Sequence, residues 1–173
     1  GRATNPGWLY RIPFTQVFQR AVSSACIGAL DGAVNSFRQR ASAHIGKHGT
    51  KMAEDVNAQQ AVTEAMMTTD QLKLVLLRNY ARIVHCAKTG DAMSVEERLL
   101  QRAQAASVPK LCFEHANELL RACAASGTFK TNPIERVMRD IATGRGHIAN
   151  NTDTYVRAHG GVMLGLPNTD PFV

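Results

Sequence analysis

Apolar side chains in the first third of the chain recur at spacings of three and four, the period of one face of an α-helix. The pattern predicts a helix over residues 14–45, ended by Gly46 and Gly49. The apolar positions on the predicted face are Phe18, Val22, Ala25, Ala29, Ala33 and Phe37. A stripe of small residues on the same helix would let a second helix or a flat ligand approach closely. This stripe consists of Ala21, Ala25, Gly28 and Gly32.

The same periodicity and two capping patterns predict the next two helices. A second helix is predicted over residues 52–88, where Gly90 supplies a left-handed stop. Ser94 and Glu97 form a capping-box pattern at the start of a third helix. Pro109 removes one backbone donor from that helix and should bend it.

Asn132 and Pro133, as N-cap and first helical residue, predict the start of a fourth helix. No segment alternates apolar and polar side chains as a half-buried strand would. These features predict an all-α fold, an antiparallel four-helix bundle over residues 14–159. Residues 1–13 would form an extended N-terminal segment, and residues 160–173, rich in glycine and proline, an irregular tail.

Composition places the chain among ordinary globular domains. Its 173 residues suit one domain, with 45% hydrophobic and 20% charged residues. The net charge of +6 is dispersed along the chain, so we expect no nucleic-acid partner. No apolar run reaches the roughly 18 residues of a membrane span, and no secretory leader is present, so we expect a cytoplasmic protein without a membrane partner. Gly1 replaces an initiator methionine, which suggests a piece of a longer protein.

Cysteine and histidine spacings favour packing roles over metal binding. The four cysteines lie far apart in apolar helical contexts, which indicates buried thiols rather than disulfides or zinc ligands. Glu114, His115 and Glu118 resemble half of a di-iron site, but the Glu-x-x-His order is reversed and no second pair occurs. We interpret His115 as a core histidine and expect no metal. A Ser-His-Asp triad stays open because spacing does not identify one, although no G-x-S-x-G elbow or phosphate-binding glycine loop occurs.

The stretch 134–151 carries the most informative polar pattern. If it stays helical, Ile148 joins the core-facing positions, whereas Arg136, Asp140 and His147 share a polar face. The arginine and the aspartate can pair across one helical turn. Nearby glycines remove side chains beside His147, so a ligand could reach an imidazole suited to acid–base chemistry near neutral pH. A solvated helix face explains the same residues equally well.

Three stretches resemble the acyl-CoA dehydrogenase fold and one of its branches. Residues 132–140, Asn-Pro-Ile-Glu-Arg-Val-Met-Arg-Asp, resemble the P-x-E-R-x-x-R-D element that opens the last long helix of that fold's C-terminal bundle. Residues 29–40 resemble its first bundle helix, whose closing arginine contacts the flavin nucleotide. The tail over residues 160–172 resembles the C-terminus of two-component flavin monooxygenases akin to p-hydroxyphenylacetate 3-hydroxylase. The resemblance covers nearly the whole chain.

One departure separates the two branches. Many acyl-CoA dehydrogenases carry a catalytic glutamate after the Arg-Asp pair, but no glutamate follows Glu135 here, and His147 stands near that place. The resemblance therefore implies a reduced-flavin-dependent aromatic hydroxylase, in which a flavin C4a-hydroperoxide transfers oxygen to a small phenolic substrate. A separate reductase would supply the flavin, usually FMN, with FAD as the alternative. An acyl-CoA dehydrogenase-like flavoprotein and a non-catalytic helical interaction domain remain open alternatives.

The resemblance also implies which residues contact the flavin and the substrate. Arg40 would bind the flavin phosphate or ribityl end, within a chain or across a subunit interface, and His147 would orient the phenol and assist its deprotonation. The residues expected to bind the cofactor are Arg11, Arg40, Ala125, Ser126, Gly127, His147 and Ile148. The residues expected to bind the substrate are Phe14 and His147. Simpler interpretations remain open, with Ser126 and Gly127 as a helix stop and Phe14 as core.

The resemblance further implies an assembly and missing parts. Family members usually form homotetramers through their C-terminal bundles, and the small-residue stripe is compatible with such packing. They carry an N-terminal helical domain and a middle β-barrel before the bundle, and neither is contained in this chain. Because the barrel supplies much of the flavin cradle, the isolated chain is expected to bind flavin poorly and to be inactive.

Overall fold

The computed structural model describes residues 4–43, 49 and 51–173 of the chain. This described part is helical and contains no strand, which confirms the predicted fold class. Its α-helices are α1 (Phe14–Ala43), α2 (Val56–Thr89), α3 (Val95–Ala122), α4 (Pro133–Arg145) and α5 (Thr152–Met163). Short 3-10 turns precede or connect them: η1 (Trp8–Arg11), η2 (Met52–Glu54), η3 (Ala124–Thr128) and η4 (Ile148–Asn150).

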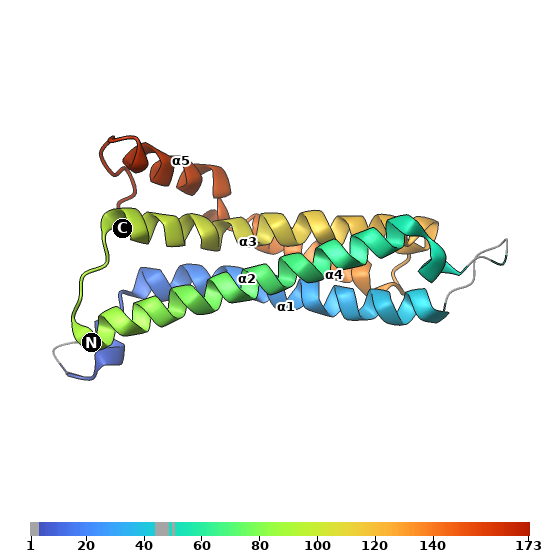
Figure 1. Ribbon diagram of the computed structural model, residues 1–173, viewed down its shortest axis with the longest axis horizontal. Helices are drawn as coiled ribbons and strands as arrows, with labels where there is room; N and C mark the ends of the chain where they lie inside the picture. Colours follow the sequence, from blue (N-terminus) through green and yellow to red (C-terminus); the bar gives the residue numbers. More distant parts are fainter. Residues whose placement is uncertain (1–3, 44–48, 50) are drawn as a thin grey trace.

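Helices α1 to α4 lie side by side along the long axis of the molecule, each running opposite to the one before it (Figure 1). Helix α3 is central, because it packs against α1, α2 and α4 and also carries α5 (Figure 1). Helix α5 lies outside the bundle, at the end where α1 begins, and both chain ends lie at that same end. The predicted antiparallel bundle is therefore present, with one additional short helix.

Capping side chains fix several of the predicted helix boundaries. Gly90 ends α2 with a φ of 88°, a conformation that favours glycine. Ser94 begins α3, where its hydroxyl accepts a hydrogen bond from the backbone N–H of Glu97 at 3.1 Å. Asn132 begins α4 by accepting from the backbone N–H of Ile134, also at 3.1 Å. These local signals were readable from the sequence because each cap satisfies a backbone group within its own turn.

The predicted start of the second helix differs from the structure, and the predicted end of the first cannot be compared with it. Helix α2 begins at Val56 rather than at residue 52, because Asp55 caps it by accepting a hydrogen bond from the backbone N–H of Asn57 at 2.9 Å. The predicted end of the first helix at residue 45 lies outside the described residues. Helix α3 runs through the buried Pro109 as one continuous helix.

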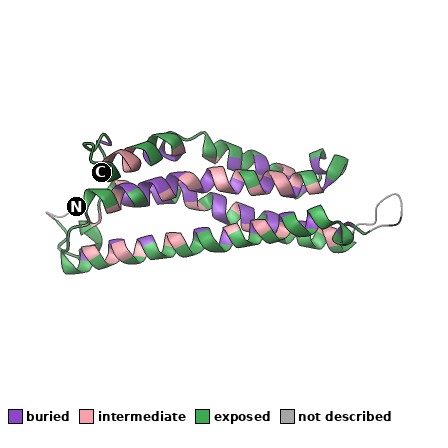
Figure 2. Cartoon of the chain, turned by 45° about the horizontal axis from the view of Figure 1, so that its top comes forward, coloured by how far each residue is buried: buried purple, intermediate pink, exposed green. Residues whose placement is uncertain are grey.

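The buried face of α1 differs from the predicted one. Phe18 is 39% exposed, Ala25 is exposed, and Val22 and Ala29 are half-buried. The buried positions are Gln16, Gln19, Arg20, Ser23, Cys26, Ile27, Leu30, Ala33, Val34 and Phe37. Apolar periodicity missed the first half of this face because polar side chains occupy it. Figure 2 shows how burial follows the inward sides of the helices.

Arg20 explains the polar half of that face. Its side chain is fully buried and is held by neutral oxygens. Nη1 donates to the backbone carbonyl of Gln16 at 2.5 Å, and Nη2 donates to the Oε1 atom of Gln101 on α3 at 2.6 Å. Burial, which removes the guanidinium from water, lowers the pKa of Arg20 to about 10. The amide groups beside it are therefore buried for hydrogen bonding rather than for apolar packing.

The main hydrophobic core lies between α1, α2, α3 and α4. Its fully buried large side chains include Leu30 and Phe37 of α1, Leu119 of α3, and Ile134 and Ile141 of α4. Burying each such side chain stabilises the fold by roughly 1.5–3 kcal/mol. This shared core holds the four long helices in fixed positions.

Helix α5 has a separate and much smaller core. Tyr155 is its buried residue, and it packs with Ala103 and Ala106 of α3. The helix ends at Met163, so the irregular tail begins at Leu164 rather than at residue 160. At the other terminus, η1 lies within the predicted extended segment over residues 1–13.

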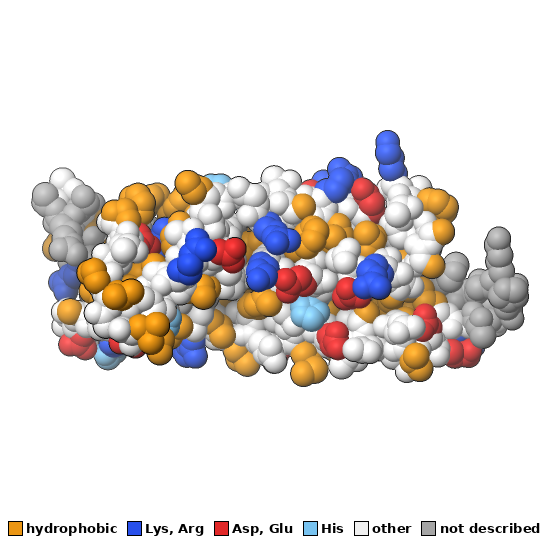
Figure 3. Space-filling view, turned by 90° about the horizontal axis from the view of Figure 1, so that it is seen from above, with side chains coloured by type: hydrophobic (Ala, Val, Ile, Leu, Met, Phe, Trp, Pro, Cys, Tyr) orange, Lys and Arg blue, Asp and Glu red, His pale blue; other side chains and the backbone are white. Residues whose placement is uncertain are grey.

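Seen from the α5 side, Lys and Arg side chains alternate with Asp and Glu across the middle of the molecule (Figure 3). Hydrophobic side chains gather over α5 and the tail in the same view. The exposed apolar residues of this region are Val156, Met163, Leu164, Leu166 and Phe172. None of the helices in the described part of the chain combines the length and apolar character of a membrane span.

The four cysteines are free thiols. Cys26, Cys112 and Cys123 are buried, whereas Cys86 is half-buried. Burial raises the pKa of the Cys112 thiol to about 12, with a smaller contribution from neighbouring Cys26. The predicted interpretation as buried thiols thus applies to three of the four.

Candidate functional site

His147 lies in the turn between α4 and η4. Helix α4 ends at Arg145, so His147 does not extend the polar face of that helix. Its Nδ1 accepts a hydrogen bond from the backbone N–H of Ala149 at 3.1 Å and thereby caps η4. Asn150 connects the turn to the end of α4, because its Nδ2 donates a hydrogen bond to the backbone carbonyl of Gly144 at 2.7 Å. Since Nδ1 is an acceptor, a neutral imidazole in this turn carries its proton on Nε2.

An aromatic row connects His147 with the first turns of α1. The rings of Phe14 and Phe18 stack with centroids 5.4 Å apart, and Phe18 meets the imidazole edge-to-face at 6.1 Å. Phe14 is 76% exposed and Ile148 is 80% exposed, so neither belongs to the core. The expected core position of Ile148 is therefore wrong, because the helix ends before it. The structure adds Phe18 to the site; its four-residue spacing from Phe14 was the available signal.

A polar cleft of about 490 Å³ opens beside His147. Lys110 of α3 and Arg145 of α4 contribute cations to it, and Asp153 of α5 contributes one carboxylate. The guanidinium of Arg145 also lies over the Phe113 ring, with its Cζ 5.2 Å from the ring centroid. The remaining lining residues are Gly146, His147, Ile148, Asn150, Asn151 and Thr152. The sequence offered no signal for the two cations, since their elements meet only in the folded chain.

Gly144 has a packing role that the sequence did not reveal. A Cβ atom at this position would lie 2.8 Å from the Sγ atom of Cys26 on α1. The glycine therefore lets α4 approach α1 closely, rather than opening space for a ligand. The predicted ion pair on α4 is present at the surface, with 3.7 Å between Nε of Arg136 and Oδ2 of Asp140.

Arg40 and Ser126 meet at the far end of α1. Nη2 of Arg40 donates to Oγ of Ser126 at 2.7 Å, and this hydroxyl donates to the backbone carbonyl of Cys123 at 2.6 Å. Arg40 lines a cleft of about 420 Å³ between α1 and the start of α4. Its Nε atom is buried and has no hydrogen-bond partner. A guanidinium in this setting suits a phosphate or carboxylate.

The turn that holds Ser126 is tightly built. A Cβ atom at Gly127 would lie 2.5 Å from the backbone carbonyl oxygen of Leu120, so the turn requires glycine there. Gly127 is buried, whereas Ala125 is exposed and Ser126 is half-buried. Ala124, which starts η3, has a φ of 51°, a left-handed conformation that is unusual for alanine. A ligand outside this turn would meet Ala125 and Ser126 before Gly127.

The two groups of predicted site residues lie at opposite ends of α1. Phe18 and Arg40 are separated by 22 residues of the helix, which corresponds to about 33 Å at 1.5 Å per residue. Phe14, His147 and Ile148 belong to one end, and Arg40 with residues 125–127 to the other.

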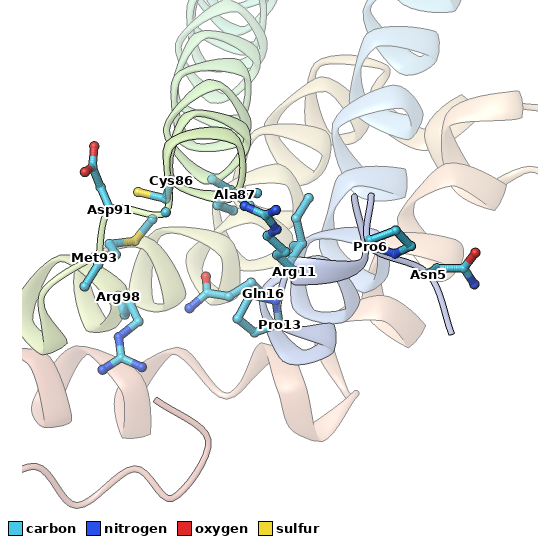
Figure 4. Close-up of a pocket in the computed structure, with 14 residues that line it drawn as sticks. Asn5, Pro6, Arg11, Pro13, Gln16, Cys86, Ala87, Asp91, Met93 and Arg98 are labelled. Carbon is cyan, nitrogen blue, oxygen red and sulfur yellow. The ribbon is translucent and has the colours of Figure 1, made fainter. Parts of the chain in front are cut away.

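Arg11 lies in a third place. It lines a cavity of about 640 Å³ together with Gln16, Ala87, Met93 and Arg98, among others, and neither Phe14 nor His147 lines this cavity. In Figure 4, Arg11 extends from η1 towards Ala87 at the end of α2, whereas Arg98 points away from it. The structure therefore does not bring Arg11 and His147 into one pocket.

His115 is half-buried on α3, and its Nδ1 atom has no hydrogen-bond partner. Within the part of the chain that the structure describes, no three His, Cys, Asp or Glu side chains gather as metal ligands would.

Comparison with known proteins gives a family and several relatives. Residues 21–152 match the family model described as acyl-CoA dehydrogenase, C-terminal domain. A pigment production hydroxylase of a Rhodococcus species is 25% identical over 177 residues, which cover 100% of this chain and 44% of the relative. The oxygenase component of an FADH2-dependent resorcinol hydroxylase from a Rhizobium species is 28% identical over 168 residues, which cover 91% of this chain and 41% of the relative. The chain thus spans less than half the length of these relatives.

Solved structures share the fold. A 3-HSA hydroxylase from a Rhodococcus species matches with a TM-score of 0.88 and 22% identity, over 99% of this chain and 43% of that one. XiaF from a Streptomyces species, in complex with FADH2 and glycerol, matches with a TM-score of 0.87 and 20% identity, over 95% of this chain and 42% of that one.

Proposed function

The chain belongs to the acyl-CoA dehydrogenase C-terminal domain family, and on this basis we propose that it is the C-terminal domain of a reduced-flavin-dependent aromatic hydroxylase. Its relatives are named as flavin-dependent monooxygenases and hydroxylases. The observation that carries the proposal is the position of His147, an exposed residue whose Nδ1 caps η4 and whose ring lies beside Phe18. No glutamate follows Glu135, which disfavours acyl-CoA dehydrogenation.

The Arg40 end would hold the phosphate or ribityl end of the flavin. Arg40 lines the adjoining cleft, so its guanidinium could donate to an anionic group bound there. Ala125 and Ser126 would lie against the flavin, and Gly127 would let their turn close. We propose FMN, supplied reduced by a separate reductase, with FAD as the alternative; both carry a phosphate for Arg40.

A homotetramer would bring the two ends of α1 together at one flavin. Because they lie about 33 Å apart along one helix, the Arg40 end of one chain would complete the His147 end of another. The small-residue stripe of α1 is exposed, as are Leu74 and Leu77 of α2, with exposures of 60% and 64%. These surfaces are available for contacts between chains.

The chemistry that reduced flavin supplies when bound is the activation of molecular oxygen. This chain would hold the aromatic substrate against the ring edges of Phe14 and Phe18 and beside Ile148. Because Nδ1 of His147 accepts from Ala149, its Nε2–H would donate a hydrogen bond to the substrate oxygen. This contact stabilises a bound phenolate and orients its ring, and a phenolate ring reacts more readily with an electrophilic oxygen. The expected assistance of His147 in deprotonation does not fit this tautomer, because Nε2 carries the proton and Nδ1 already accepts from Ala149.

Two substitutions of His147 test the proposal in the intact flavin-loaded protein. His147→Asn retains a side chain that can cap η4, but its amide is too short to reach the substrate as Nε2 does. His147→Ala removes both the cap and the donor. We expect both to lower the phenolic product formed per reduced flavin consumed by about tenfold or more, the effect typical of a lost hydrogen-bonding catalytic group.

His159→Ala, at a half-buried histidine of α5, is the matched control and should retain the parent yield. An unchanged yield in both His147 variants would overturn the proposed role. Reduction of the bound oxidised flavin by an acyl-CoA, without any reductase, would overturn the hydroxylase assignment and favour a dehydrogenase-like activity.

A further inference from the structure

A buried ion pair connects the C-terminal tail to α3. Nε of Arg102 lies 2.5 Å from Oδ2 of Asp170, and both residues are nearly inaccessible to solvent, with exposures of 5% and 7%. The carboxylate comes from an irregular segment, so no helix periodicity places it there. The two atoms pair by charge and proximity, without the alignment of a hydrogen bond. Burying two charges is costly unless they pair, so this pairing selects one position for the tail.

The tail is built to present this carboxylate. Oδ1 of Asp170 accepts a hydrogen bond from the backbone N–H of Phe172 at 2.9 Å, which leaves Oδ2 for Arg102. Asn168 closes the turn from the other side, because its Oδ1 accepts from the backbone N–H of Asp170 at 2.8 Å and its Nδ2 donates to the Asp170 carbonyl at 3.0 Å. Hydrogen bonds within the turn thus fix the direction of the Asp170 carboxylate.

Arg102 also contacts the helix that follows the His147 turn. Its Cζ lies 3.9 Å from the centroid of the Tyr155 ring, a cation–π geometry. The hydroxyl of the same tyrosine donates to the backbone carbonyl of Ile148 at 3.3 Å. Ile148 directly follows His147, so the contacts run from Asp170 through Arg102 and Tyr155 to the proposed substrate-binding turn.

The other side of the tail reaches the first turn of α1. The hydroxyl of Thr15 donates to the backbone carbonyl of Phe172 at 3.4 Å, and Thr15 directly follows Phe14. The Phe172 ring, 60% exposed, lies with its centroid 5.8 Å from Cζ of Arg102. The tail therefore contacts Thr15, the neighbour of Phe14, directly. It reaches Ile148, the neighbour of His147, only through Arg102 and Tyr155.

We propose that Arg102 and Asp170 are positioning residues that hold the tail, the His147 turn and the first turn of α1 in one arrangement around the aromatic substrate. The inference rests on the proposed function of His147, which it deepens by adding the tail as part of the substrate site. Apart from this contact, helix α5 is held to α3 by a small core of Tyr155 with two alanines and by a hydrogen bond from the Thr152 hydroxyl to the Ala106 carbonyl. Loss of the ion pair would leave α5 and the His147 turn free to shift while the main bundle stays folded.

Two substitutions test the two contacts separately: Asp170→Asn tests the ion pair with Arg102, and Tyr155→Phe tests the hydrogen bond to Ile148. The first keeps the shape of the side chain and removes the charge that pairs with Arg102. The second keeps the ring beneath Arg102 and removes the hydrogen bond to Ile148. Asp140→Asn makes the same charge change in an exposed ion pair and is the matched control.

Amide hydrogen exchange of the full chain measures how often the His147 turn opens. We expect both variants to speed exchange at the amides of Ala149 and Asn150 by about tenfold or more, while Leu30 and Ile141 in the main core keep their protection. The control should match the parent at all four amides. Exchange at residues 149 and 150 within about twofold of the parent, in both variants, would overturn the proposal.

A second readout separates positioning from general stability. In the intact flavin-loaded protein, both variants should lower the product formed per reduced flavin while flavin consumption continues at the parent rate. Equal losses of flavin consumption and product would instead indicate a purely structural role. The two hypotheses can fail separately. An unchanged product yield in His147→Ala would refute the proposed function, whereas the exchange rates of Asp170→Asn and Tyr155→Phe at residues 149 and 150 test the positioning role on their own.

Discussion

Arg40 and Ser126 join two distant parts of the chain through a hydrogen bond of 2.7 Å from Nη2 to Oγ. The bond ties the last turn of α1 to η3, next to the start of α4 at Asn132, whose Nδ2 donates to the Ser126 carbonyl at 3.2 Å. The hydrogen bond fixes the Nη2 atom of the guanidinium, whereas the buried Nε atom has no hydrogen-bond partner. The pair presents a preorganised cation, which lowers the ordering cost of binding an anion.

Replacement of Arg40 by lysine tests whether this fork geometry matters. Arg40→Lys keeps the charge but loses the planar pair of donors, so flavin affinity of the intact protein should fall about tenfold. Titration with FMN and FAD, followed by flavin fluorescence, measures the effect and ranks the two cofactors. Arg38→Lys, two residues earlier and exposed, is the control and should keep the parent affinity. Equal affinities in all three proteins would refute a flavin role for Arg40.

The buried Cys112 thiol predicts a loss of stability at alkaline pH. Its pKa is raised from 9.0 to about 12 in the folded chain, so above pH 9 the unfolded thiol ionises while the folded one stays protonated. The folded state then holds more protons, and stability falls as the pH rises towards 12. Cys112→Ala should reduce the loss between pH 7 and pH 10 by about 1.4 kcal/mol.

Urea unfolding under reducing conditions at the two pH values measures this loss. Cys86→Ala, at the half-buried thiol, is the control and should lose as much stability as the parent. If Cys112→Ala loses as much stability between pH 7 and pH 10 as the parent does, the loss does not come from the Cys112 thiol.

The exposed small-residue stripe predicts where chains meet. A Cβ atom at Gly28 contacts nothing within 4 Å in the single chain, so Gly28→Leu should fold normally. If a second helix packs on the stripe, the same leucine would clash there and shift the proposed tetramer towards smaller species. Sedimentation velocity measures the assembly. Gly160→Leu on α5, which also meets nothing within 4 Å, is the matched control, and an identical tetramer in both variants would exclude this interface.

The contributions of Arg20 and Gln101 to the free energy of unfolding should be coupled, because the two side chains are hydrogen-bonded to each other. Arg20→Met should lower the free energy of unfolding by about 2 kcal/mol, because it leaves the buried Oε1 atoms of Gln16 and Gln101 without their guanidinium donor. Adding Gln101→Leu should recover part of that loss, and a double-mutant cycle measures the coupling. A single variant more stable than the parent would show that guanidinium desolvation outweighs its hydrogen bonds.

Local sequence signals predicted most of the helix boundaries and pointed to several candidate site residues. Gly90, Ser94 and Asn132 mark helix ends because each acts on backbone groups within its own turn. Periodicity predicted the all-α bundle, and the resemblance of its motifs led to Arg40 and His147. These features are readable because their physical causes lie within a few residues of sequence.

Which residues act together depends on contacts between segments that are far apart in the sequence. The buried face of α1 could not be read from apolar periodicity, because Arg20 is buried there with a hydrogen bond to Gln101 from another helix. Helix α5 and the tail are placed by Arg102, whose partner Asp170 lies far along the chain. The orientation of His147 follows from where α4 ends. Such contacts depend on burial and charge pairing between distant segments, which no local pattern encodes.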